Sequence, residues 1–430
     1  TDTLGAIGSL AVSITVASGI SVTTSIPATA LTINRAATEF IPVTATAGVG
    51  PYLYAIDKPL PAGLSFNTAT GAITGTATES SVQTTYTITA TDTNGSTGSA
   101  TTDITVNVAI AVTGDATLIT TTAIAAATTA YSATGGTGAL TFSATGTTAD
   151  ITFDPATKII SVATTATAGT YPITITVTDT LGATGSTALT VTVNAAIAVT
   201  GATTLAATAG VAKATGAYSA TGGTGALTFS ATGTTADITF DPATKIISVA
   251  TTATAGTYPI TITVTDTLGA IGSTALTVTV NAAIAVTGPT TLAATTGVAA
   301  ATSAYSATGG TGALTFSLTG APTGVTIGSS SAIVSVATTT APGTYSITVV
   351  ATDTNGATGS APLELTVNVA IAVTGDATLI TTTAIAAATT AYSATGGTGA
   401  LTFSATGTTA DITFDPATKI ISVATTATAG

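Results

Sequence analysis

A block of 87 residues recurs along this 430-residue chain, and this periodicity restricts the possible folds more than any other feature. The pentapeptide IAVTG begins at Ile110, Ile197, Ile284 and Ile371, and the segment AYSATGGTGALTFS begins at Ala130, Ala217, Ala304 and Ala391. Residues 109–169 and 370–430 are identical at an offset of three blocks. Blocks of this length are the size of small domains, so the periodicity predicts a tandem array rather than one large core.

Residues 170–194 have the pattern of a β-hairpin. Ile173 and Ile175 alternate with threonines, and after a turn that contains glycine Leu189 and Val191 alternate with threonines again. Period-2 alternation predicts two strands with one buried face. Further copies of the hairpin lie at 257–281 and, less closely matched, at 86–107 and 345–368.

About seven short strands are expected in each block. In the block at 109–195 they are 110–113, 117–125, 130–134, 139–144, 150–154, 159–163, 170–178 and 187–194, and the first two are predicted to form one split strand. Gly, Thr and Asp-Pro interrupt the pattern about every 8–12 residues. Regular short strands without a helical period predict an all-β sandwich.

The predicted core of this block consists of residues from most of these strands. They are Tyr131, Leu140, Phe142, Ile151, Phe153, Ile160, Ile173, Ile175, Leu189 and Val191. Their outward neighbours are mostly Thr and Ser, which suit an exposed pleated surface. Such a core has few aromatic residues, so a single unit is expected to be only moderately stable and to gain stability from its neighbours.

The periodicity divides the chain into six segments. They are the terminal strand of a partial domain (1–16), a divergent domain (17–108, repeat A), three full domains (109–195, repeat B; 196–282, repeat C; 283–369, repeat D) and a partial domain lacking its final hairpin (370–430, repeat E). Junctions such as Val193-Asn194-Ala195-Ala196-Ile197 leave almost no linker. The array is therefore predicted to form an extended rod with partial domains at both ends.

Repeat E ends where the next hairpin is expected. The identity with repeat B predicts that a segment like Thr170–Val177 follows Gly430. Without it, repeat E exposes a sheet edge, so either the chain continues or a neighbouring chain donates a strand, with residues 1–16 as the candidate donor. We favour continuation, because residues 1–16 supply only the last strand and not its partner.

The composition excludes several functions. Cys, His, Met and Trp are absent, so disulfides, thiolate or imidazole catalysis and Cys/His zinc sites are impossible. Charged residues make up 6% of the chain, against about 25% in ordinary domains. Only six residues are basic, which leaves no cluster for binding nucleic acid or an anionic membrane. No run of 18 apolar residues occurs, so no membrane span is predicted.

Repeat A carries the motifs of a known family. They are Leu60-Pro61-Ala62-Gly63-Leu64-Ser65-Phe66, Thr70-Gly71-Ala72-Ile73 and Ala90-Thr91-Asp92, within the segments 51–77 and 85–108. These segments closely resemble the putative-Ig, cadherin-like repeats of bacterial and archaeal surface proteins. Repeat D keeps part of the first motif as Ala321-Pro322-Thr323-Gly324-Val325, whereas repeats B and C have lost it. The resemblance implies an Ig-like sandwich in a long extracellular protein that acts as a stalk, adhesin or surface layer, with no catalytic residues.

Two acidic positions and one basic position that recur in the repeats are interpreted as turn residues. Four residues along a strand span about 13 Å, more than the roughly 5–9.5 Å between the carboxyls of a glycosidase pair. The acidic pairs are Asp150/Asp154, Asp237/Asp241 and Asp411/Asp415, and the lysines of the same turns are Lys158, Lys245 and Lys419. We also considered an isopeptide bond from Lys158 to Asn194, but lysines in turns are expected to be exposed.

One aspartate recurs at each hairpin, as Asp92, Asp179, Asp266 and Asp353. A calcium ion takes six to eight oxygen ligands, so a calcium site at the domain junctions would need help from a neighbouring residue such as Asp115 or Asp376. A plain Asx-turn is the favoured interpretation. Asn94-Gly95 and Asn355-Gly356 fit tight hairpin turns, and Asn94-Gly95-Ser96 is an N-glycosylation sequon.

Three further possibilities concern the threonines and glycines. The exposed threonine rows could carry O-glycans. An ice-binding face is disfavoured, because it would need a flat array and Ig strands twist. The Gly135–Gly138 loop lacks a following helix and a lysine, so it is not expected to bind phosphate.

The predicted function is that of a structural protein which forms an extracellular filament or cell-surface stalk by self-association with identical chains. The near-identical units and the weakly charged Thr/Ala surface favour it. The alternative is the spacer region of a large cell-surface adhesin whose ligand-binding domain lies elsewhere. No enzymatic activity, catalytic residue, metal site or cofactor is predicted, and a hydrolase has no support in these residues.

Overall fold

A computed structural model describes Thr1 and residues 3–430 of the chain. The described residues form 41 β-strands and no helix. They divide into two compact units, the first made of Thr1–Ala198, Thr221–Leu227 and Thr265–Gly272, and the second of the remaining residues. The first unit thus includes two loops of repeat C. Both loops contact repeat B, where Thr121 bonds to Thr224 and Asp266.

Repeat B, in the first unit, shows the architecture of a full repeat. Its strands are β10 (Ala111–Thr113), β11 (Thr117–Thr121), β12 (Ala126–Ala127), β13 (Ser132–Thr134), β14 (Thr141–Thr145), β15 (Ile151–Asp154), β16 (Ile159–Val162), β17 (Gly169–Thr178) and β18 (Thr184–Asn194). A four-stranded sheet has the order β11-β18-β17-β14, a three-stranded sheet the order β12-β16-β15, and β10 pairs with β13. β11 runs parallel to β18, and the other pairings are antiparallel.

One buried cluster joins the two larger sheets of repeat B into a sandwich. Ile151 and Ile160 from the three-stranded sheet pack with Ile173, Ile175 and Leu189 from the four-stranded sheet. Of the other predicted core residues, Tyr131 and Val191 are buried, Phe142 and Phe153 are half-buried against the cluster, and Leu140 is also half-buried. The predicted inward residues therefore do form or line the core.

One detail of the predicted strands in repeat B is wrong. The strand expected at 117–125 ends at Thr121, because a turn with positive φ at Ala123 redirects the chain and the short β12 then joins the other sheet. β10 and β11, the two parts of the predicted split strand, pair with β13 and β18 in different sheets.

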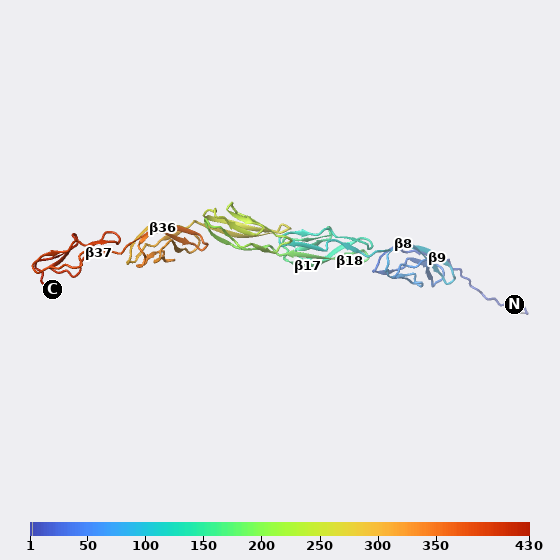
Figure 1. Ribbon diagram of the computed structural model, residues 1–430. Coiled ribbons are helices and arrows are strands. Elements are labelled where there is room, and N and C mark those ends of the chain that lie inside the picture. Colours follow the sequence, from blue (N-terminus) through green and yellow to red (C-terminus); the bar gives the residue numbers. More distant parts are fainter. Residues whose placement is uncertain (2) are drawn as a thin grey trace. The chain divides into compact units, whose positions relative to one another are not determined.

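Repeat A, also in the first unit, has the same two larger sheets with more irregular strands. Its strands are β1 (Ser21–Thr24), β2 (Ala28–Thr32), β3 (Ala36–Phe40), β4 (Val43–Thr46), β5 (Leu53–Ile56), β6 (Leu64–Phe66), β7 (Ile73–Thr76), β8 (Ser81–Thr91) and β9 (Thr97–Asn107). The sheet orders are β2-β9-β8-β5, β3-β7-β6 and β1-β4. Figure 1 shows the long hairpins β8–β9 and β17–β18 of the two repeats.

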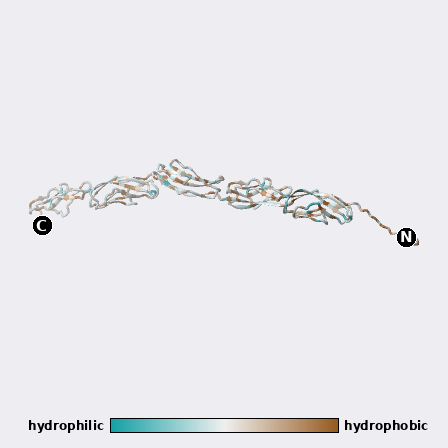
Figure 2. Cartoon of the chain, turned by 45° about the vertical axis from the view of Figure 1, so that its right-hand side comes forward, coloured by the Kyte–Doolittle hydropathy of each residue, from teal (hydrophilic) through white to brown (hydrophobic). Residues whose placement is uncertain are grey.

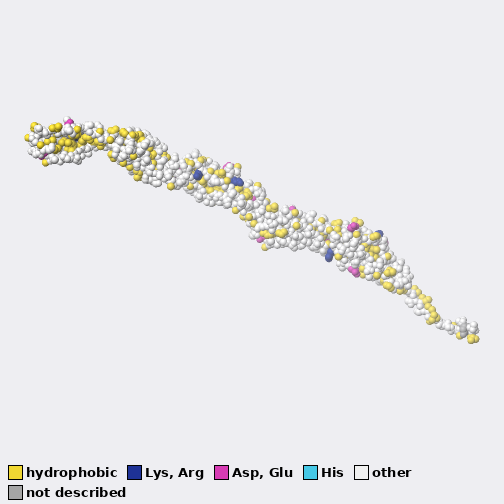
Figure 3. All heavy atoms as spheres, turned by 60° about the horizontal axis from the view of Figure 1, so that its bottom comes forward, with side chains coloured by type: hydrophobic (Ala, Val, Ile, Leu, Met, Phe, Trp, Pro, Cys, Tyr) yellow, Lys and Arg dark blue, Asp and Glu magenta, His cyan; other side chains and the backbone are white. Residues whose placement is uncertain are grey.

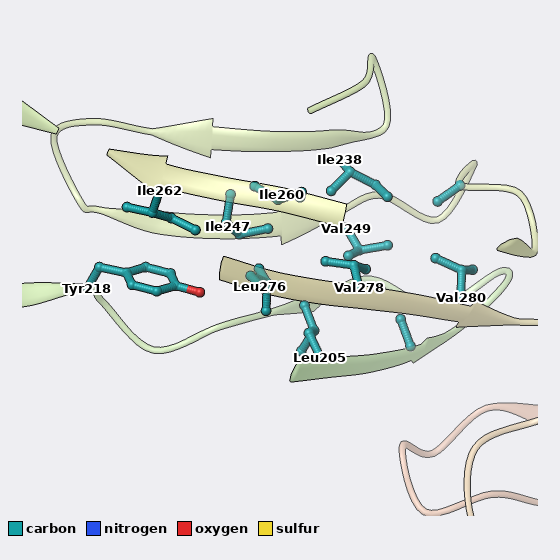
Figure 4. Close-up of a cluster of buried hydrophobic side chains, with 12 residues drawn as sticks. Leu205, Tyr218, Ile238, Ile247, Val249, Ile260, Ile262, Leu276, Val278 and Val280 are labelled. Carbon is teal, nitrogen blue, oxygen red and sulfur yellow. The ribbon is translucent and has the colours of Figure 1, made fainter. Parts of the chain in front are cut away.

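Most of repeat C and all of repeat D lie in the second unit and repeat this strand order. The strands of repeat C are β19 (Ala198–Thr200), β20 (Thr204–Thr208), β21 (Lys213–Ala214), β22 (Ser219–Thr221), β23 (Thr228–Thr232), β24 (Ile238–Asp241), β25 (Ile246–Val249), β26 (Gly256–Thr265) and β27 (Ile271–Asn281). Those of repeat D are β28 (Ala285–Thr287), β29 (Thr291–Thr295), β30 (Ala300–Ala301), β31 (Ser306–Thr308), β32 (Thr315–Thr319), β33 (Val325–Ile327), β34 (Val334–Val336), β35 (Gly343–Thr352) and β36 (Thr358–Asn368). Figure 4 shows the core of repeat C, where Ile238 and Ile247 from one sheet face Ile260 and Leu276 from the other.

Repeat E contains β37 (Ala372–Thr374), β38 (Ala387–Ala388), β39 (Ser393–Thr395), β40 (Ile412–Asp415) and β41 (Ile420–Val423). These strands form the three-stranded and two-stranded sheets, and residues 370–430 contain no four-stranded sheet. Side chains including Val373, Phe403 and Phe414 consequently line an open hollow. This agrees with the predicted exposure of its apolar face.

Residues 3–16 were expected to form a terminal strand, but they do not. They pair with no strand among the described residues, and Leu10, Val12 and Ile14 are all exposed. The brown N-terminal segment in Figure 2 shows their apolar character. A ladder of backbone hydrogen bonds to a neighbouring strand holds an alternating segment in a sheet, and no such ladder in the described part of the chain includes residues 3–16. Asp2 lies outside the described residues.

Every strand pairing in the described part of the chain lies within a single predicted repeat. We therefore propose the predicted boundaries at 17–108, 109–195, 196–282, 283–369 and 370–430 as domain boundaries.

A buried tyrosine links the strands at one end of repeat C. The Tyr218 hydroxyl donates to the Ala202 carbonyl at 2.6 Å, and only 1% of the residue is exposed. Tyr218→Phe leaves that carbonyl without its donor, so we expect the stability of repeat C to fall by about 1–2 kcal/mol. Amide exchange of residues 202–216, whose sequence occurs once in the chain, measures the change. Tyr258→Phe is the control, because the Tyr258 hydroxyl bonds at an exposed site. Equal effects of the two substitutions would contradict this role of the buried hydroxyl.

Candidate functional site at the repeat junctions

Four aspartates in the described part of the chain are buried: Asp92 of repeat A, which is 6% exposed, and one in each of repeats B, C and D. The three in repeats B, C and D, Asp179, Asp266 and Asp353, are 5%, 6% and 7% exposed and also contact the preceding repeat. Buried carboxylates are costly unless hydrogen bonds or charges compensate them. The hydrogen bonds that compensate these carboxylates therefore identify the residues around which the site is organised.

One carboxylate oxygen of each aspartate shapes the hairpin turn. In repeat D, Asp353 Oδ1 accepts hydrogen bonds from the backbone N–H groups of Asn355 and Ala357, both at 2.8 Å. The equivalent donors to Asp179 Oδ1 and Asp266 Oδ1 lie at 2.9 Å. This is the predicted Asx-turn, which satisfies turn amides locally.

The other oxygen reaches into the preceding repeat. Asp353 Oδ2 accepts from the backbone N–H of Thr311 at 2.8 Å and from the hydroxyl of Thr208, in repeat C, at 2.6 Å. Asp266 has the same bonds from Thr224 and from Thr121 of repeat B. Asp179 has them from Thr137 and from Thr32 of repeat A. Each aspartate therefore joins two consecutive repeats.

An asparagine at the end of the last long strand completes each junction. In the second unit, Asn281 Nδ2 donates to Thr311 Oγ1 at 2.9 Å, and the hydroxyl oxygens of Thr208 and Thr311 are 2.8 Å apart. We call these four side chains (Asp353, Thr311, Thr208, Asn281) and their equivalents the junction cluster. Its aspartate and loop threonine form the head of the following repeat, and its strand threonine and asparagine form the tail of the preceding one.

The glycine-rich loop puts the head together. Gly136 has a φ of +74°, and a Cβ there would lie 2.9 Å from Ile110 Cγ1 and 3.2 Å from Asp179 Cβ. Only glycine allows so close an approach in this backbone conformation. The loop thus places the Thr137 amide against the aspartate. The sequence alone assigned no role to this glycine-rich motif, and the structure shows that it shapes the head.

The junction of repeats D and E, and the hairpin turn of repeat A, each contain part of the cluster. At the junction of repeats D and E, Thr398 Oγ1 lies 2.7 Å from Thr295 Oγ1 and accepts from Asn368 Nδ2 at 3.0 Å. In repeat A, Asp92 accepts only backbone bonds, from Val49, Asn94 and Ser96. Asp92 thus provides a natural comparison, an Asx-turn without a threonine hydroxyl among the described residues.

The hydrogen bonds decide the charge state of the buried aspartates. Burial by itself raises the pKa of Asp353, but the bonds from the Thr208 hydroxyl and from the N–H groups of Thr311, Ala357 and Asn355 outweigh it and hold the pKa below its usual value. The pKa values of Asp179 and Asp266 are lowered for the same reasons. The carboxylates are therefore ionised and act as acceptors.

The same geometry argues against the calcium alternative. Four donors already point at the two oxygens of each of the three junction carboxylates, whereas a cation needs acceptors around it. Asp115, the neighbour considered for such a site, accepts from Thr129 within its own repeat. Among the described residues no group of three or more His, Cys, Asp or Glu side chains is placed to hold a metal ion.

The other acidic candidates stabilise turns. Asp154 accepts from the Ala156 amide at 2.9 Å and the Thr157 hydroxyl at 2.7 Å, and its pKa is lowered mainly by the Thr157 bond. Asp150 instead accepts a short hydrogen bond from Thr165. Asp237/Asp241 and Asp411/Asp415 repeat these contacts. The turn interpretation holds.

The expectation for the lysines is wrong. Lys158 is half-buried rather than exposed, has a φ of +61°, and its Nζ lies 4.8 Å from the centre of the Phe142 ring. Lys245 and Lys419 are placed in the same way over Phe229 and Phe403. A cation–π contact and the packing of the aliphatic stem explain this position. Asn194 donates to Thr224 Oγ1, so the isopeptide candidates take part in different contacts.

Sequence reasoning identified the aspartates but missed the site around them. The signal was present, because the loop threonine, the turn aspartate and the strand-ending asparagine all recur at the 87-residue spacing. What was lacking is the knowledge that β11 runs parallel to β18, which places Thr121 beside Asn194 at the same end of the domain.

Comparison with known proteins supports the fold seen here. Residues 11–109 and 282–368 match the family described as "Putative Ig domain". Both segments are similar to this family. The repeats between and after them follow the same 87-residue period as repeat D, so the chain is a tandem array of Ig-like β-sandwiches. The match indicates no catalytic family, and a comparison with curated proteins found no match.

Several solved structures are similar along much of their length. They include the immunoglobulin domains 1–5 of Sidekick-1 (13% identity, 82% of this chain and 81% of that one, TM-score 0.33). The human desmocollin-1 ectodomain matches at 12% identity (92% and 91%, TM-score 0.29), and the titin I-band fragment I67–I69 at 10% (62% and 99%, TM-score 0.35). Because these TM-scores are below 0.5, the assignment rests on the family match and the sheet topology instead.

The lowered pKa of Asp353 predicts a definite pH dependence. Its stabilisation is fully present above the pKa of an unfolded aspartate, about 3.9, and is lost as the pH falls through the lower folded-state value. Amide exchange of Asn355 and Ala357, corrected for intrinsic rates, should therefore accelerate between pH 4 and pH 2. Asp353→Asn should exchange faster at pH 6 but change little with acid. A wild-type turn that is equally protected at pH 2 and pH 6 would contradict this.

Proposed function

We propose that this chain is a spacer or stalk of an extracellular or cell-surface protein, in which the number of repeats sets the length of the stalk. The observation that carries the proposal is the junction cluster, which joins consecutive sandwiches through buried hydrogen bonds instead of a flexible linker. Domains that are coupled in this way keep their spacing better than domains on free linkers.

The interior of the repeats agrees with a structural role. The cores of repeats B, C and D are filled by aliphatic side chains and a buried tyrosine. The recurring carboxylates all serve turns or junctions. No helix in the described part of the chain is long and apolar enough to cross a membrane. In an adhesin, a ligand-binding domain outside these residues would do the binding.

A spacer predicts a simple relation between repeat number and length. Removing residues 196–282 joins Ala195 to Ala283 and recreates the native sequence Asn-Ala-Ala-Ile at the junction. We expect the maximum dimension measured by small-angle X-ray scattering to fall by one repeat length, and removal of 109–195 to have an equal effect. A deletion of 196–239, which cuts a sandwich, is the control and should unfold the remainder of repeat C. A maximum dimension that does not depend on the number of repeats would contradict the spacer role.

A second candidate function is lateral self-association into filaments. It is favoured by the outer face of the four-stranded sheet, where Ser143, Thr176 and Ser186 form one cross-strand row and Thr141, Thr178 and Thr184 the next. Figure 3 shows charged side chains only as isolated spots on the face in view. Such a surface offers little like-charge repulsion between chains.

Added charge on this face tests the second candidate. Thr174 and Thr261 are equivalent exposed residues of repeats B and C. If the face mediates association, Thr174→Lys with Thr261→Lys should shift the chain toward monomer in sedimentation velocity at high concentration. Ala156→Lys with Ala243→Lys adds the same charge on exposed turns and should leave association unchanged. A wild-type chain that stays monomeric at every concentration would rule out this candidate.

A further inference from the structure

The junction clusters have the same geometry although the repeats that form them differ. Repeat A has little sequence in common with repeat B, yet Thr32 donates to the next aspartate at the same 2.6 Å as Thr121 and Thr208. The loop-threonine amide donates at 2.8 Å in all three junctions. The asparagine bonds to the loop threonine are 2.9–3.0 Å long.

The residues around the clusters are not shared. At the first junction, Arg35 Nε donates to the Leu181 carbonyl at 3.0 Å. In repeat C, the corresponding position is Val211, which packs against the apolar cluster of Ile284 and Ala357. At that junction Asn355 Nδ2 also donates to the Ala206 carbonyl. The constant part of the interface is therefore the cluster of four polar side chains.

The hydrogen-bonding groups of the cluster are complementary only when the head of one repeat meets the tail of another. The head presents an ionised carboxylate, and the tail presents a hydroxyl and a carboxamide N–H that can donate. Two heads would place carboxylates against each other, and two tails would leave their donors without a charged acceptor. Hydrogen bonds to an ionised group are also the stronger kind. Head-to-tail pairing is thus the arrangement that satisfies every group.

We propose that the head of each repeat is a binding site for the tail of any repeat of this type, which recognises a threonine hydroxyl and an asparagine carboxamide without a metal ion. Successive repeats are coupled by this site, and their tails are interchangeable. The inference concerns the junction and does not depend on the spacer role, because a filament or an adhesin could use the same coupling.

The first test breaks one junction in the chain of residues 1–430. The protein has no cysteine, so Thr232→Cys and Thr319→Cys, at exposed positions of repeats C and D, provide spin-label sites. In the wild-type junction we expect a narrow distribution of distances between the two labels. Thr208→Val removes the hydroxyl donor and should broaden this distribution. Asp353→Asn should also broaden it, because the new carboxamide can turn an N–H group toward the Thr311 donor. The Thr311 amide should exchange about tenfold faster or more in either variant.

Three controls make this test decisive. Thr208→Ser keeps the hydroxyl and should retain the narrow distribution, which separates the hydrogen bond from a folding defect. Asp92→Asn changes an equivalent Asx-turn that lacks the hydroxyl partner and should leave the C–D distribution unchanged. Calcium or a chelator should also have no effect. The proposal is overturned if Thr208→Val keeps the narrow distribution, or if the chelator broadens it.

The second test exchanges a tail. The chain without residues 196–282 places Thr121 and Asn194 of repeat B against Thr311 and Asp353 of repeat D, a pair that is not adjacent in the native chain. Labels at Thr145→Cys and Thr319→Cys should give a distribution as narrow as the native C–D pair, and Thr121→Val should broaden it. A broad distribution in the deleted chain, with both repeats folded by circular dichroism, would show that the tails are not interchangeable.

Discussion

The hydrogen bond from a threonine hydroxyl to a buried carboxylate is the interaction on which the array of domains depends. A carboxylate that is removed from water is costly unless donors replace its hydration. Backbone amides of one repeat supply three of the four donors to Asp353, and the fourth comes from Thr208 of the preceding repeat. A repeat alone therefore exposes an incompletely satisfied acceptor, and the preceding repeat completes it. The polar head therefore favours contact with a neighbouring repeat. The apolar core, which is buried within its own sandwich, does not.

The cores explain why this coupling matters. Each is built from Ile, Val, Leu and one buried tyrosine, with the phenylalanines only half-buried at the margin. A domain of fewer than 100 residues buries a modest share of its surface, so its free energy of unfolding is small. Interactions between nearest neighbours then form a larger part of the total than they would in a bigger domain. In this chain the interactions that the junctions have in common are polar and directional, so they fix the order of head and tail as well as adding stability.

Much of the fold could be predicted from alternation alone, because Ile173, Ile175, Leu189 and Val191 follow the period of a strand with one buried face. The misses have physical causes. Residues 117–125 look like one strand because their composition continues unchanged, but the positive φ at Ala123 sends the chain to the other sheet. Lys158 looks like a solvated turn residue, yet the ring of Phe142 is close enough to hold its ammonium group. The junction cluster could not be predicted because Thr32 is one threonine among many, and only its position at the end of a parallel edge strand makes it a donor.

The period of the sequence and the geometry of the junction constrain each other. Residues 109–169 and 370–430 are identical and three repeats apart, so a segment that spans most of a repeat has been copied within the chain. A copied repeat meets new neighbours on both sides, and its head must accept a tail that it did not previously contact. Copying would fail at the first insertion if each junction depended on its own set of apolar contacts. Because the head needs only a hydroxyl and a carboxamide at fixed positions, and repeats A, B and C supply both despite their differences, an inserted repeat satisfies its neighbours without further change.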